Sequence, residues 1–296
     1  MKAIDRRTRV QLSNILFCTD LSDAANNALP YAAQLARTFE AKLFALYVKS
    51  ADGDRRLEDS EIFSAPAESI EMQARTVIMN LLDNFPGIQS DILVEEGNVW
   101  PVLASVIAKK QIDLVVLGTR GRTGLNKLLL GSVAEDIFRQ APCPVLTVGP
   151  HSSMESSKAG EIAEILYATD FSPESLAAAP YAISLAEEYQ ANLTLLHVIA
   201  EPRRGDLVTP EQLLTSSERL LHDLVPLEAE SWCKLRFMIE RGAAAVKILE
   251  IAKERKADLI VLGVRRPSGG AATHLPIATA HKIVSYGNCP VLTVRV

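Results

Sequence analysis

Apolar residues in the first half of the chain fall into short runs separated by longer amphipathic stretches. Five runs read as buried strands, at 14–20, 41–48, 88–94, 114–117 and 144–148. Short, aliphatic runs bounded by polar residues or glycine are typical of parallel strands buried on both faces. Helical apolar spacing fills most of the intervals, at 24–38, 68–85, 99–110 and 132–140. Alternating strands and helices predict an α/β domain with a parallel sheet and helices on both of its faces.

The same pattern then starts again. The segment NILFCTDLS at 14–22 returns as EILYATDFS at 164–172, and DLVVLG at 113–118 returns as DLIVLG at 258–263. CPVLTV at 143–148 returns unchanged at 289–294. Such agreement indicates two copies of one α/β unit. We therefore expect domains at 1–150 and 162–296 joined by a linker at 151–161, with a solvated helix of the second copy at 207–224.

A glycine-rich basic segment follows the fourth expected strand. Gly118, Gly121 and Gly131 lead into a helix that is expected to begin near Ser132. Glycine lets the backbone approach a ligand closely, and a helix N-terminus offers free N–H groups and a positive dipole end. Cationic side chains in the same segment are Arg120, Arg122 and Lys127. The segment is therefore typical of an anion site.

Composition narrows the class of protein. The chain has 296 residues, of which 48% are hydrophobic and 23% charged, and its formal net charge is −5. These values fit a globular protein and argue against general binding to nucleic acid or to anionic membranes. No apolar run approaches the roughly 18 residues that a membrane span requires. Its 4 cysteines form no C-x-x-C pair, so we expect buried reduced thiols and a cytoplasmic protein.

Taken together, these motifs resemble the universal stress protein (UspA-like) family in its tandem form. The family's phosphate motif, G-x2-G-x9-G-[ST], matches Gly118, Gly121, Gly131 and Ser132 at every spacing. The resemblance implies two tandem Rossmann-like (adenine nucleotide alpha hydrolase-like) domains, each a five-stranded parallel sheet in the order 3-2-1-4-5. It also implies pairing through strand five, which the two repeats could form internally, and a homodimer is a further expectation.

The resemblance assigns a role to each matching residue. Asp20 would accept hydrogen bonds from ribose hydroxyls beside Thr19, and the main chain of Val48 would face the adenine edge. The phosphates would lie against the Gly-rich segment and the start of the helix, lined by Leu117, Gly118, Arg120, Gly121, Gly131, Ser132 and Val133. The implied ligand is ATP or another adenine nucleotide, with Mg²⁺ brought by the phosphates. No metal site of the protein itself is expected.

The second copy departs from the motif. Asp170, Val198 and Gly263 stand in the positions of Asp20, Val48 and Gly118, but Ile277-Ala278 replaces Gly131-Ser132. A β-branched side chain and the nearby Pro276 disturb the place where phosphate would meet bare backbone. We therefore expect this repeat to keep the fold, to lose ordinary ATP binding and to act as an internal partner. A different anion nest at 268–270 stays an alternative.

Several alternatives remain open for the first copy. Asp20 could cap the following helix, and the glycines could serve only as turn residues. Hydrolysis of ATP needs a group that positions water or a metal near the γ-phosphate, and the segment 118–132 holds no carboxylate or histidine. We expect a nucleotide-binding stress protein with no catalytic residue. A slow Mg²⁺-dependent ATPase and an interaction scaffold without ligand are the competing hypotheses.

Overall fold

The chain divides into two compact units, which are described separately. The computed structural model describes residues 9–49, 67–119, 130–150, 152, 162–201, 209–226, 229, 231, 233–265 and 275–295. The N-terminal unit comprises residues 11–150, and the C-terminal unit comprises residues 151–296 together with the first ten residues. Arg9 pairs with Glu188, and the Val10 N–H donates to Ser184 Oγ at 3.0 Å, both within the C-terminal unit.

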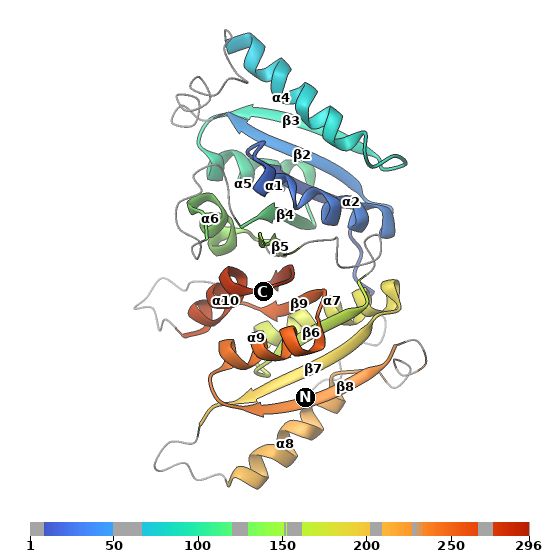
Figure 1. Ribbon diagram of the computed structural model, residues 1–296, viewed down its shortest axis with the longest axis vertical. Coiled ribbons are helices and arrows are strands. Elements are labelled where there is room, and N and C mark those ends of the chain that lie inside the picture. The colour runs from blue at the N-terminus through green and yellow to red at the C-terminus, as the bar shows by residue number, and fades with distance from the viewer. Residues whose placement is uncertain are drawn as a thin grey trace. The chain divides into compact units, whose positions relative to one another are not determined.

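The N-terminal unit is built on a parallel five-stranded sheet. Its strands are β1 (Asn14–Thr19), β2 (Lys42–Lys49), β3 (Ser90–Glu96), β4 (Leu114–Gly118) and β5 (Val145–Val148). They lie in the order β3-β2-β1-β4-β5, with every pair parallel, as expected. The described helices are α1 (Asp23–Asn26), α2 (Leu29–Thr38), α4 (Ala67–Leu82), α5 (Val99–Lys110) and α6 (Ser132–Gln140). Figure 1 shows α4 along β3.

The C-terminal unit repeats this plan. Its strands are β6 (Glu164–Thr169), β7 (Asn192–Ile199), β8 (Leu235–Arg241), β9 (Leu259–Gly263) and β10 (Val291–Val294). Their order is β8-β7-β6-β9-β10, again with parallel pairs throughout. The described helices are α7 (Pro173–Tyr189), α8 (Pro210–Asp223), α9 (Ala244–Arg255) and α10 (Leu275–Tyr286). The helix expected at 207–224 is found as α8, which begins at Pro210 behind a capping box of Thr209 and Gln212; residues 207–208 lie outside the described residues.

Right-handed crossovers decide which helices share a face of each sheet. In the order 3-2-1-4-5, the connections that lead to β2 and β3 run in one direction and those that lead to β4 and β5 run in the other. α1, α2 and α4 therefore cover one face of the N-terminal sheet, and α5 and α6 cover the other. The strands lie between these layers, and Ile15, Leu16 and Val115 are 0% exposed. The ligand-binding edge of such a sheet is at the carboxyl ends of its strands.

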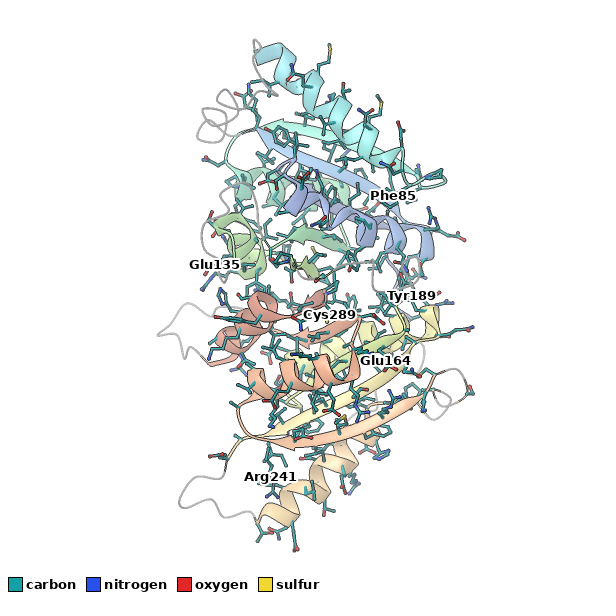
Figure 2. All side chains as sticks on the ribbon, viewed as in Figure 1. Phe85, Glu135, Glu164, Tyr189, Arg241 and Cys289 are labelled. Carbon is teal, nitrogen blue, oxygen red and sulfur yellow. The ribbon has the colours of Figure 1, made fainter. Side chains whose placement is uncertain are left out.

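One aspartate fastens the opposite, amino edge in each unit. Asp113 Oδ2 accepts hydrogen bonds from both backbone N–H groups of residues 13–14, at 2.8 and 2.9 Å. Asp258 Oδ2 makes the same pair of contacts with residues 163–164, both at 2.9 Å. Figure 2 shows Glu164 where β6 begins. The repeated aspartate is therefore structural, because it holds the start of the central strand against its neighbour.

The single helix expected at 24–38 is wrong, because it is broken between Asn26 and Leu29. Pro30 cannot donate a helical hydrogen bond and sits in the first turn of α2, where this loss costs least. Yet Pro180, its counterpart, lies inside the continuous helix α7. The difference lies just upstream, since asparagines precede Pro30 whereas leucine and alanines, which are better helix formers, precede Pro180.

Candidate functional site

Strand register brings predicted site residues of the N-terminal unit together. Thr19 pairs with Tyr47, and Cys18 with Leu117. Continued past the end of β1, the register sets Asp20 between Val48 of β2 and Thr119, the residue after β4. The predicted residues at the ends of β1 and β4 are Thr19, Leu117 and Gly118. These residues thus share the carboxyl edge of three adjacent central strands.

Asp20 and Ser22 shape the turn that leaves β1. Asp20 Oδ1 accepts hydrogen bonds from the backbone N–H of Ser22 at 3.0 Å and from its hydroxyl at 2.5 Å. Ser22 is the N-cap of α1 and accepts a bond from the Ala25 N–H. Between them, Leu21 has a φ of 66°. Ser22 therefore caps the helix, and the carboxylate of Asp20 holds the capping residue.

Thr19 contributes mainly to the same turn. Its hydroxyl donates to Asn26 Oδ1 at 2.8 Å and accepts from the Leu21 N–H at 2.9 Å. The Asn26 side chain also donates to the carbonyl of Leu21 at 3.4 Å. Thr19 is only 8% exposed. Sequence reasoning missed Asn26, although two adjacent asparagines inside an expected helix are a signal of a turn.

The start of α6 lies next to β4. Gly131 is the N-cap, with φ −61° and ψ 149°, and its N–H donates to the carbonyl of Thr119 at 3.0 Å. The Thr119 N–H in turn donates to the Val148 carbonyl at 2.9 Å. The first N–H groups of a helix have no intrahelical acceptors. In α6 these donors include the N–H groups of Ser132 and Val133. Both residues are exposed.

Two charged side chains of α6 lie after its first N–H groups in the sequence and pair with each other. Glu135 lies in the first turn of α6 and pairs with Arg139, with its Oε1 at 2.8 Å from the nearest guanidinium nitrogen. Figure 2 shows Glu135 on the outer side of the helix. The predicted residues Arg120 and Gly121, and the other cations at 122 and 127, lie outside the described residues.

The corresponding edge of the C-terminal unit contains a pocket of about 260 Å³. All three residues expected for the degenerate second site, Asp170, Val198 and Gly263, line it. The other lining residues come from strands β6, β7 and β9 and from helices α7, α9 and α10: Ala168, Thr169, Ser175, Leu196, Ala244, Ile248, Leu262, Thr279, Ala280 and Ile283. The helix residues were not found from the sequence, because local periodicity does not reveal which distant helices meet.

Asp170 is held by a turn like that of Asp20. Its Oδ1 accepts the Ser172 N–H at 3.0 Å. Thr169 Oγ1 lies 3.0 Å from Ser175 Oγ, and the Tyr167 hydroxyl donates to the Ser175 carbonyl at 2.7 Å. Burial opposes ionisation of Asp170, but hydrogen bonds from Ser172 to its carboxylate outweigh burial and lower its pKa below the ordinary value. Asp170 is therefore a carboxylate at neutral pH.

Gly263 has a packing role in the C-terminal unit. A Cβ built on this residue would lie 2.1 Å from the Glu174 carbonyl oxygen and 2.3 Å from the Ser175 Cα. These backbone atoms belong to the first turn of α7. The absence of a side chain at Gly263 thus lets α7 approach β9 closely. This packing alone explains why the second repeat has a glycine at this position, without a bound phosphate.

Other chemistries find little support in the part of the chain that the structure describes. No group of three or more histidine, cysteine or acidic residues there could hold a metal ion. Burial raises the pKa of the Cys143 and Cys289 thiols to about 12, so they stay protonated rather than nucleophilic. No described helix has both the length and the apolar character needed to cross a bilayer.

Comparisons with known proteins agree with this architecture. The model of the universal stress protein family matches residues 12–149 and again 162–295. A universal stress protein of Methanocaldococcus jannaschii is 32% identical over 151 residues, or 50% of this chain and 88% of its own length. One from Mycobacterium tuberculosis is 26% identical over 253 residues, 82% of this chain and 77% of its own.

A solved universal stress protein of Archaeoglobus fulgidus shares the fold along nearly the whole chain. Its TM-score is 0.68 at 22% identity, with 97% of this chain and 99% of that chain covered. Because the family model matches both halves, the chain belongs to the universal stress protein family and carries two of its domains in tandem.

Proposed function

We propose that the N-terminal unit binds an adenine nucleotide, with ATP as the first candidate, and that the chain acts as a nucleotide-binding regulator of the stress response. The observation that carries the proposal is the start of α6. Gly131 ties the helix start to Thr119, beside the end of β4, so unsatisfied N–H groups of the first turn lie at the edge that also bears Asp20. Backbone donors of this kind suit phosphate oxygens.

The remaining residues suit the nucleoside part. The turn fixes the Asp20 carboxylate, an acceptor for ribose hydroxyls. The β1–β2 register ends at Thr19 and Tyr47, whereas β2 continues to Lys49. Main-chain groups around Val48 therefore lie beyond the ladder with β1, where they could read the edge of an adenine. Bound Mg²⁺ would be held chiefly by the phosphates.

Calorimetry on the intact chain tests the proposal. We expect one ATP per chain, and a loss of affinity of at least about tenfold in Ser132→Glu, because a carboxylate would face the phosphates. Gly131→Val should act in the same direction. Ala278→Glu, at the equivalent place in the C-terminal unit, is the matched control and should leave ATP binding unchanged.

Each other outcome selects a competing hypothesis. No binding at millimolar ATP would overturn the proposal in favour of a scaffold. Multiple turnover that requires Mg²⁺ and disappears with the same variants would make the protein a slow ATPase. Native mass spectrometry of the purified protein would detect a retained nucleotide directly. We place this function in the cytoplasm, since all four cysteines are free thiols.

We further propose that the two repeats pair through their fifth strands. Within its own sheet, β5 or β10 is an outermost strand with the sequence Val-Leu-Thr-Val. An uncharged apolar edge is a template for pairing with another strand. Hydrogen exchange should therefore be as slow in β5 and β10 as in β4 and β9. Exchange as fast as in the other outermost strands, β3 and β8, would contradict this pairing.

A further inference from the structure

The pocket of the C-terminal unit combines an aliphatic wall with one carboxylate among its described lining residues. Its wall is mostly aliphatic, from Leu196 and Val198 of β7 to Ile248 of α9 and Ile283 of α10. Among the lining residues that the structure describes, Asp170 alone carries a charge. A carboxylate among aliphatic side chains, with no lysine or arginine in the described part of the lining, favours a neutral ligand with hydroxyl donors.

The polar groups beside Asp170 are committed to the turn. Ser175 Oγ donates to the Ser172 carbonyl at 3.0 Å, which leaves Thr169 as the donor in its contact with Ser175. Thr169 Oγ1 also accepts the Phe171 N–H at 3.0 Å. These bonds fix the turn in advance of binding, and they leave the ionised carboxylate as its principal acceptor for a ligand.

The early start of helix α10 changes which backbone N–H groups are free to bind a phosphate. Counted back from the shared CPVLTV, Ala278 is the counterpart of Ser132, yet α10 begins three residues earlier, at Leu275. Only the first four N–H groups of a helix lack intrahelical acceptors. The N–H groups of Thr279 and Ala280 therefore fall inside the helical ladder, whereas their counterparts in α6 are first-turn donors.

We infer that this second pocket binds a nucleoside without phosphates, whose ribose hydroxyls donate to Asp170 and whose base lies among the aliphatic side chains. The ligand class rests on the function proposed for the N-terminal unit, because the Asp170 turn repeats the Asp20 turn. The volume of about 260 Å³ is just below the roughly 300 Å³ at which pockets for drug-sized ligands begin. A single small molecule fits this size.

Titration of the full chain with adenosine tests the inference. In an Asp20→Asn background we expect one adenosine per chain, weakened at least about tenfold by Asp170→Asn, since a carboxylate is the stronger acceptor. Ala244→Phe should abolish this binding by filling the pocket. Val246→Phe, on the same helix but 52% exposed and outside the lining, is the matched control and should bind adenosine normally.

ATP titrations of the same proteins separate this inference from the proposed function. ATP binding should persist in Ala244→Phe and fall in Ser132→Glu. Adenosine binding that survives Ala244→Phe, or no adenosine binding at all, would overturn the inference. Failure of the chain to bind ATP, with an adenosine site still sensitive to Ala244→Phe, would overturn the proposed function alone.

Discussion

The helix after β4 begins at Ser132 behind a glycine N-cap, whereas the helix after β9 begins at Leu275, one position before Pro276. The turns after β1 and β6 instead share an aspartate that accepts the N–H two residues later and a positive φ at Leu21 and Phe171. The two units therefore agree at the aspartate turn after the first strand and differ at the start of the helix after the fourth strand. The start of that helix is the part that a phosphate would need under the proposed function.

The largest effect should come from Gly263→Ala. Its Cβ would overlap backbone atoms of Glu174 and Ser175, which cannot move aside as a flexible side chain could. We expect a loss of about 3 kcal/mol or more in the free energy of unfolding, measured by urea denaturation. Gly87→Ala is the control, because a Cβ there meets open space and only the φ of 84° is strained. A loss no greater than that of Gly87→Ala would refute the packing role.

A smaller effect is expected from Asn26→Leu, which gives the N-terminal unit the residue of the C-terminal one. The change removes the acceptor of the nearly buried Thr19 hydroxyl and the donor to the Leu21 carbonyl. We expect a loss of about 1–3 kcal/mol in urea unfolding. The reciprocal Leu176→Asn should cost less, since the Thr169 hydroxyl contacts Ser175 instead. Equal losses would show that the two turns are not held differently.

A glycine substituted at the C-cap of α5 or α9 should stabilise the two units to the same degree. Gln111 ends α5 with φ 50°, and Lys256 ends α9 with φ 52°. Glycine adopts this left-handed conformation without the steric cost that a Cβ incurs. Gln111→Gly and Lys256→Gly should each raise the free energy of unfolding by about 0.5–1 kcal/mol, seen as a higher thermal midpoint. Stabilisation of only one unit would break the symmetry of the repeats.

The smallest effect concerns acid stability. The pKa of Asp170 is lowered in the folded state from 3.8, so its contribution is present above that value and is lost as pH falls through the folded pKa. Unfolding of Asp170→Asn should therefore depend less steeply on pH in this acid range than unfolding of the parent. Chemical denaturation between about pH 2 and 5 measures the slope. An unchanged slope would mean that the turn does not stabilise the carboxylate.

Much of the fold follows from local pattern. The helices expected at 99–110 and 132–140 match α5 and α6, since apolar spacing marks the buried face and flanking residues mark the ends. The strands expected at 14–20 and 114–117 likewise end within one residue of β1 and β4, which end at Thr19 and Gly118. The break before α2 did not, because Pro30 is equally compatible with a first turn and with a helix interior such as that around Pro180.

The candidate sites also contain some residues that the sequence could predict and others that it could not. Asp170, Val198 and Gly263 all line the pocket because repeats preserve register, and their role toward a ligand stays a prediction. Ala244 and Ile248 could not be anticipated, since α9 reaches this pocket only through the path of the folded chain. Gly263 stands in the position of Gly118, to which the resemblance gives a phosphate role, but its packing against α7 could not be read from the sequence, because a missing side chain looks the same whether a ligand or another helix approaches it.

Arg9 and Val10 have a consequence for the chain as a whole. They precede β1, yet their described partners, Glu188 and Ser184, belong to α7. In terms of connectivity, the C-terminal unit is discontinuous and the N-terminal unit is an insertion within it. A fragment that starts at residue 151 would therefore lack part of its own domain. A variant that deletes residues 11–150 and joins Val10 directly to residue 151 would restore that part.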